Sequence, residues 1–166
     1  MKVYSKICDG VNKVISVLLF IVFTVMTLVA VTEVVRRYIW GLSFVWSDEF
    51  LRYMLVWMAF LGGPVALRRS KLAKFDLGHN KLSERTRDIL AIVVIVIEIV
   101  LFAFILVYSY RWATSFSAQK SRMNSINLTM QPVYFSVPVG MVFCELFSIE
   151  HLLQRIIKMK GGQGSK

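Results

Sequence analysis

The sequence predicts an all-α membrane protein with four transmembrane helices, and two observations support that prediction. Of the 166 residues, 57% are hydrophobic and 18% are charged, and the mean hydropathy is +0.62; soluble domains have an apolar share of about 45–50%. The apolar residues are also gathered into four long runs with basic residues between them. The net charge of +10 therefore does not indicate a nucleic-acid partner, because its charges do not form one patch or stripe on a soluble surface.

Each apolar run is expected to form one membrane span, at about residues 14–35, 48–67, 89–110 and 133–153. About 20 residues of helix cross a hydrocarbon core of about 30 Å. The first run is longer than the apolar core of a secretory signal peptide and no Ala-x-Ala cleavage site follows it, so we expect a span there. The connections leave no room for a second domain, which predicts a single four-helix transmembrane domain over residues 1–166.

The second span has an unusual start, because charged residues precede an apolar run that is too short by itself. The run from Tyr53 to Leu67 makes a helix of only about 22 Å. A helix that begins at Asp48, with the Ser47 hydroxyl as its N-cap, reaches about 30 Å. We therefore expect the span to begin at these polar residues.

The charges at this start suit the end of a helix. Asp48 and Glu49 fall in the first turn, where the helix dipole favours negative charge. Arg52 follows Asp48 by four residues and Glu49 by three, so we expect ion pairs that neutralise these charges at the membrane boundary. Trp46 and Trp57 add aromatic side chains typical of the interface, although Trp57 is deep enough to pack against protein.

The stretch before this span, VVRRYIWGLSFVW at residues 34–46, combines two arginines with aromatic side chains and is broken by Gly41. Such a composition suits a segment that lies in the headgroup layer. The sequence therefore predicts a short interfacial amphipathic segment before the second span.

The Lys and Arg residues predict the orientation of the chain. Fourteen of the 20 lie in the N-terminal segment, in the connection between the second and third spans, or in the C-terminal tail. Basic flanks are retained on the cytoplasmic side. Both termini are therefore expected to be cytoplasmic.

Two acidic residues and one glycine lie within the spans. Glu98 and Glu145 both fall near mid-membrane, where an ionised carboxylate in contact with lipid is costly. They could form a proton or cation relay or make hydrogen-bonded packing contacts with protein; packing is favoured because no basic residue lies at matching depth. Gly62, in the sequence Gly-Gly-Pro, can bend the second span and let another helix approach closely.

The sequence contains no motif that indicates an enzyme. It lacks a Ser-His-Asp set, a Gly-rich phosphate loop and a Cys-x-x-Cys pair. His79 and His151 are far apart in the sequence and have no Cys or carboxylate at ligand spacing, so we expect neither a metal site nor a cofactor.

The stretch RRYIWGLSFVWSDEFLRYMLVWMAFLGGPVALRRSKLAKFDL, residues 36–77, resembles the small membrane subunit (DctQ-like) of tripartite ATP-independent periplasmic (TRAP) transporters. That family has a Trp-Ser-Glu-Glu motif, an Arg three residues later, a Trp, and then Leu-Gly and Ala before a basic loop. The matching residues here are Trp46, Ser47, Asp48, Glu49, Arg52, Trp57, Leu61, Gly62, Ala66, Arg68 and Arg69. The fourth span matches through Tyr134, Pro138 and Gly140. The chain departs from the pattern in having Asp48 for the commoner Glu and no His in the loop near Leu72.

The resemblance implies a subunit of the bacterial inner membrane that has no catalytic residues. Its partners would be a large TRAP permease subunit, in a heterodimer, and a periplasmic substrate-binding protein, with membrane lipids around it. The complex would take up organic acids, such as sialic acid or C4-dicarboxylates, driven by sodium. The residues expected at the subunit interface or in a structural role are Trp46, Ser47, Asp48, Glu49, Arg52, Trp57 and Gly62. A self-contained four-span transporter that acts as a homo-oligomer remains the alternative.

Overall fold

The computed structural model describes residues 2–69, 84–125 and 129–161, and its regular structure is helical. The basic residues Lys71, Lys74 and Lys81 of the connection used to predict the orientation lie outside these ranges. The helices are α1 (Lys2–Ile39), α2 (Ser47–Arg69), α3 (Glu84–Ala113), α4 (Phe116–Lys120), α5 (Gln131–Tyr134) and α6 (Ser136–Gly161). One isolated bridge joins Arg122 to Thr129. The predicted all-α fold is confirmed.

Within the described residues, four helical segments are long and apolar enough to cross a membrane: Val3–Ile39, Ser47–Arg69, Asp88–Ala113 and Gln131–Ile157. Each contains one of the four spans expected from the sequence. The last combines α5 and α6, which are separated at Phe135. The 38 residues of α1 extend over about 57 Å, nearly twice the thickness of the hydrocarbon core.

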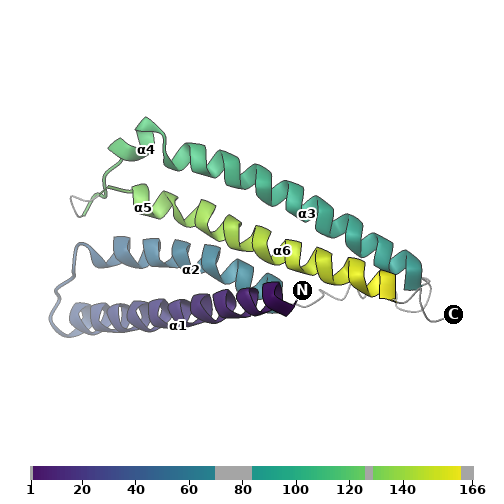
Figure 1. Ribbon diagram of the computed structural model, residues 1–166. Coiled ribbons are helices and arrows are strands. Elements are labelled where there is room, and N and C mark those ends of the chain that lie inside the picture. Colours follow the sequence, from purple (N-terminus) through teal and green to yellow (C-terminus); the bar gives the residue numbers. More distant parts are fainter. Residues whose placement is uncertain (1, 70–83, 126–128, 162–166) are drawn as a thin grey trace.

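The long helices lie side by side in the order α1, α2, α6, α3 (Figure 1). Helix α2 packs between α1 and α6, and α3 packs on the other side of α6. In the described part of the chain α1 and α3 do not touch. The helices thus form a row rather than a closed ring. We call the end where α1 begins and α6 ends the terminal end of the row, and the other the hairpin end.

A narrow seam between α1, α2 and α6 holds the core. Its buried apolar residues are Cys8, Ile15, Leu61, Val65 and Phe147. Helix α6 approaches α2 closely at Gly140, where an added Cβ would collide with the main-chain carbonyl of Phe60 in α2. Glycine is required there because any larger residue would push the two helices apart.

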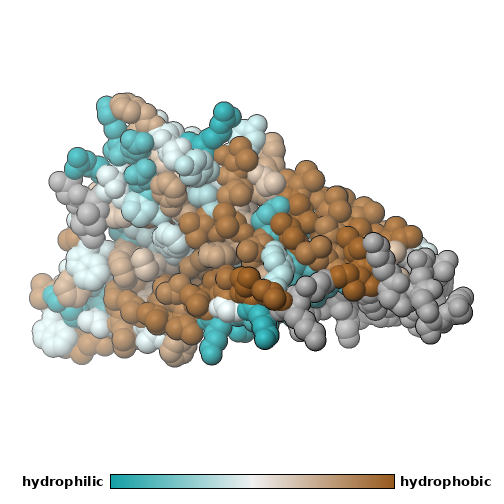
Figure 2. Space-filling view, viewed as in Figure 1, coloured by the Kyte–Doolittle hydropathy of each residue, from teal (hydrophilic) through white to brown (hydrophobic). Residues whose placement is uncertain are grey.

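Many large apolar side chains, above all those of α1 and α3, are exposed. Phe20 and Val100, for example, are 71% and 65% exposed. Figure 2 shows apolar residues over the middle of the row and hydrophilic residues gathered around α4 at the hairpin end. This distribution is the one expected of helices whose outer surface faces lipid.

The stretch expected to form an interfacial segment is divided in the structure. Residues 34–39 continue α1, and residues 40–46 are turn or irregular structure, with Gly41 at φ 64°. A left-handed φ is readily adopted only by glycine, which explains why the helix ends here. A separate amphipathic segment in the headgroup layer stays a prediction.

Candidate functional site

At the hairpin end, Glu49 joins the start of α2 to the connection between α4 and α5. Its side chain accepts hydrogen bonds from the backbone N–H groups of Asn124 (2.9 Å) and Ser125 (2.7 Å). The Tyr53 hydroxyl, one turn further along α2, donates to the same carboxylate. A carboxylate that accepts from several donors remains stable when buried. Glu49 therefore fixes the path of a connection 75 residues away in the sequence.

A second carboxylate secures the turn between α1 and α2. Glu33, near the end of α1, is only 7% exposed and accepts hydrogen bonds from the Ser43 hydroxyl and from the backbone N–H of Phe44, at 3.2 and 3.3 Å. The guanidinium of Arg36 lies 3.8 Å from the centre of the Phe44 ring. These contacts hold a turn that has no regular hydrogen-bond pattern of its own. We call Glu33, Ser43, Phe44, Glu49, Tyr53, Asn124 and Ser125 the hairpin-end cluster.

The start of α2 differs from the sequence expectation in how its polar groups are used. The helix begins at Ser47, whose hydroxyl donates to the Phe44 carbonyl (2.8 Å), and no described first-turn N–H donates to that hydroxyl. In the described chain, Arg52 also forms no ion pair with Asp48 or Glu49. Both Arg52 and Asp48 are exposed. The expected ion pair between Glu49 and Arg52 does not form because the Glu49 side chain is directed toward the connection that follows α4.

The remaining residues singled out around this start have separate surroundings. The Trp46 ring lies 5.4 Å from the ring of Phe44 and 5.8 Å from that of Phe50. Trp57 is partly buried against the core seam. Gly62 has open space around the position of a Cβ, so the close helix approach expected there occurs instead at Gly140. Any contact of these residues with another subunit stays a prediction.

At the terminal end, Arg68 connects three helices. Its Nε donates to Glu150 Oε2 (2.9 Å), and its terminal nitrogen donates to Glu150 Oε1 (3.2 Å) and to Asp9 Oδ1 (2.8 Å). Gln154 donates to Glu150 as well (3.2 Å). Glu150 is only 3% exposed, so this two-point contact compensates a buried charge. Asp9, Arg68, Glu150 and Gln154 are the terminal-end cluster.

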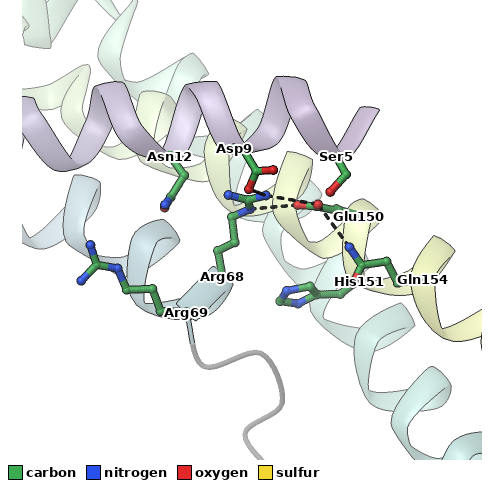
Figure 3. Close-up of a pocket in the computed structure, with 8 residues that line it drawn as sticks. All are labelled: Ser5, Asp9, Asn12, Arg68, Arg69, Glu150, His151 and Gln154. Atoms are coloured by element: carbon green, nitrogen blue, oxygen red, sulfur yellow. Dashed lines mark hydrogen bonds and ion pairs between the residues drawn. The ribbon is translucent and has the colours of Figure 1, made fainter. Parts of the chain in front are cut away.

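A polar cavity of about 390 Å³ adjoins this cluster. Figure 3 shows Arg68 between Asp9 and Glu150, with Arg69 extended away from them. The lining residues are Ser5, Asp9, Asn12, Arg68, Arg69, Glu150, His151 and Gln154. Within the described residues, no group of three or more His, Cys, Asp or Glu is arranged to hold a metal ion. The cavity is therefore suited to polar or charged groups rather than to a metal.

The two mid-membrane glutamates belong to neither cluster. Glu98 lies on α3 and Glu145 on α6. These two helices are neighbours at one side of the row. Both side chains are partly buried, and Glu145 Oε2 is enclosed without a hydrogen-bond partner. Their role, as a relay or as packing groups, stays a prediction.

The sequence expectations missed the partners of both clusters. Asn124 and Ser125 contribute main-chain N–H groups, which no side-chain pattern indicates, and the Ser125 side chain adds a further hydrogen bond. A signal did exist at the terminal end: Arg68 and Glu150 are opposite charges near the ends of two spans expected on the same side of the membrane. Such pairs at equal depth are expected to meet when their helices are neighbours.

Comparison with known proteins gives the family. Residues 26–158 match the family model described as tripartite ATP-independent periplasmic transporters, DctQ component. The chain is also similar to the sialic acid TRAP transporter small permease protein SiaQ of Vibrio cholerae serotype O1. The two are 23% identical over 163 residues, which cover 95% of this chain and 90% of that protein.

Proposed function

The chain belongs to the DctQ family of tripartite ATP-independent periplasmic transporters and is a multi-pass membrane protein, and from this premise we propose that it scaffolds a large permease subunit. The complex carries out sodium-driven uptake of an organic acid delivered by a periplasmic binding protein. This chain forms one transmembrane domain and carries no substrate pathway of its own.

The arrangement of the helices supports this proposal. In the part of the chain that the structure describes, a row one helix thick encloses no central channel, and the core seam involves α1, α2 and α6. Large apolar side chains remain exposed along the long helices, which leaves ample surface for another membrane protein. This exposed apolar surface of the long helices is the single observation that best supports a scaffold role.

The proposed orientation gives each end a different task. With both termini cytoplasmic in the inner membrane, the hairpin end faces the periplasm. The connection held by Glu49 then lies on the side from which a binding protein approaches. We propose that Trp46, Ser47, Asp48, Arg52 and Trp57 support this corner.

Gly62 is proposed as a further contact position. Its Cβ position is open, so the backbone of α2 is accessible there. Such a position allows another membrane-embedded group to approach the helix backbone closely.

The similarity to a sialic acid transporter subunit supports organic acids as the substrate class. Sialic acids and C4-dicarboxylates are both carboxylates. Discrimination between them is expected to reside in the binding protein and the large subunit, so the substrate is best identified on those partners.

The proposal is tested by purifying the tagged chain from its native membrane and identifying co-purifying proteins by mass spectrometry. A large permease subunit is expected at equal stoichiometry. Proteoliposomes containing both subunits should then take up labelled sialic acid or a C4-dicarboxylate only with the binding protein outside and an inward sodium gradient. Uptake by liposomes that contain this chain alone would contradict the proposal and favour a self-contained homo-oligomer.

A further inference from the structure

Two cavities adjoin on the seam between α1 and α2 and share Arg69. The first is the polar cavity of about 390 Å³ beside the terminal-end cluster. The second is a largely apolar groove of about 370 Å³, lined on α1 by Ser16, Leu19, Phe20 and Phe23 and on α2 by Met58, Gly62 and Val65, with Arg69 at its end. Arg69 thus lines both a polar cavity and a largely apolar one.

The groove follows one face of α2. Met58, Gly62, Val65 and Arg69 are spaced by four, three and four residues, which aligns them along one side of a helix. From the first to the last, this stripe is about 16 Å long. Gly62 leaves the groove open, because no atom lies within 4 Å of the position its Cβ would occupy.

Arg69 differs from its neighbour Arg68 in having an uncompensated charge. Arg68 is bound by both carboxylates of the polar cavity, Asp9 and Glu150. In the described ranges Arg69 forms no ion pair, and Figure 3 shows it directed away from those carboxylates. An exposed guanidinium therefore stands where the polar cavity meets the apolar groove, a position suited to a phosphate.

We propose that this seam binds one anionic phospholipid, with its phosphate on Arg69 and one acyl chain in the groove. The dimensions favour an acyl chain over a helix. A volume of about 370 Å³ along about 16 Å gives a cross-section on the order of 23 Å². A helix with its side chains is about 10–12 Å wide, far too wide for such a groove. The lipid would fill the seam and brace α1 against α2 at the terminal end.

The test uses phosphatidylglycerol as the probe. The wild-type protein and its variants, each with any large subunit that co-purifies, are placed in phosphatidylcholine nanodiscs with a small fraction of phosphatidylglycerol. Lipid retained after detergent extraction is then counted per chain by mass spectrometry. Arg69→Gln is expected to lower retention about fivefold, the effect of one basic residue near an anionic headgroup. Gly62→Leu is expected to lower it as well, because the leucine side chain would occupy the groove.

Two matched controls separate the site from general effects. Arg37→Gln removes an exposed arginine at the opposite end of α1, and Gly63→Leu adds the same side chain at an open position that lines neither cavity. Both should retain phosphatidylglycerol as the wild type does. Circular dichroism and the elution volume should be unchanged for all four variants.

Three results would overturn the proposal. The first is equal retention in the wild type, Arg69→Gln and Gly62→Leu. The second is displacement of the lipid by inorganic phosphate alone, which would show a simple anion site without an acyl-chain groove. The third is loss of a co-purifying membrane protein in Gly62→Leu at unchanged lipid retention, which would show that a helix occupies the groove.

Discussion

The two ends of the row both depend on buried carboxylates, but the groups that these carboxylates hold are different. At the hairpin end Glu49 accepts hydrogen bonds from the backbone of a connection. At the terminal end Glu150 binds the guanidinium of Arg68 from another helix. The first contact is made mainly with backbone N–H groups, to which the Ser125 side chain adds. The second requires two particular side chains, and the loss of Arg68 leaves the buried carboxylate of Glu150 without its counter-charge.

The largest effect is expected from the terminal end. Arg68→Leu leaves Glu150, which is 3% exposed, without its counter-charge. Breaking a buried ion pair from one side costs about 3–5 kcal/mol. The free energy of unfolding, measured by denaturant titration in detergent micelles, should fall by that amount. The double variant Arg68→Leu with Glu150→Leu should recover part of the loss, and a fully additive loss would show that the pair is not coupled.

A smaller and more local effect is expected at Glu49. In Glu49→Gln one of the two carboxylate oxygens becomes an amide nitrogen, which cannot accept, so the backbone N–H of Asn124 or that of Ser125 loses its acceptor. Leaving a buried donor unsatisfied costs about 1–3 kcal/mol. Hydrogen exchange at the amides of Asn124 and Ser125 should accelerate about tenfold or more, while α6 stays protected. Asp48→Asn is the matched control, because Asp48 is exposed; equal acceleration in both variants would contradict a specific role for Glu49.

A third substitution tests the seam that lies between the two ends. Gly140→Ala places a methyl group against the Phe60 carbonyl, so α2 and α6 must separate slightly. Overpacking of this kind costs about 1–3 kcal/mol. The midpoint of thermal unfolding should fall in Gly140→Ala and stay within error in Gly62→Ala, where the space is open. The same midpoint for both variants would indicate that the helices adjust without cost.

The smallest effect is expected at Arg52. No ion pair joins it to the described residues, and exposed charges of this kind contribute about 0–1 kcal/mol. Arg52→Gln should therefore leave unfolding of the isolated chain unchanged. Loss of the co-purifying large subunit in this variant would instead assign Arg52 to the subunit interface.

The membrane spans could be predicted well from the sequence, whereas the two clusters could not. A span depends on the length of an apolar run, which is a local property. The role of Glu49 depends on packing, because its partners in the connection lie 75 residues later and offer mainly backbone groups. The i,i+3 and i,i+4 spacing to Arg52 correctly described helix geometry. The spacing predicted the wrong partner for Glu49, because the fold brings the backbone N–H groups of Asn124 and Ser125 to the Glu49 carboxylate.

The glycines show the same limit of prediction from the sequence. The sequence indicates Gly62 as a position of close approach and Gly140 only as a match to the family pattern. Within the described chain the contact is made by Gly140, which faces Phe60 of α2, whereas Gly62 faces open space. Composition identifies which positions are small, and the arrangement of the row decides which of them are used.

The length of α1 has a consequence for the vertical position of the whole hairpin. Asp9 near one end of α1 is bound to Arg68, and Glu33 near the other end is bound to the turn that leads into α2. The two attachment points are about 36 Å apart along the helix. A slip of α1 by a single helical turn, about 5.4 Å, would break both contacts together. The α1–α2 hairpin therefore has a fixed length. A bilayer whose hydrocarbon core does not match this length must deform around the hairpin, because α1 cannot slide along α2.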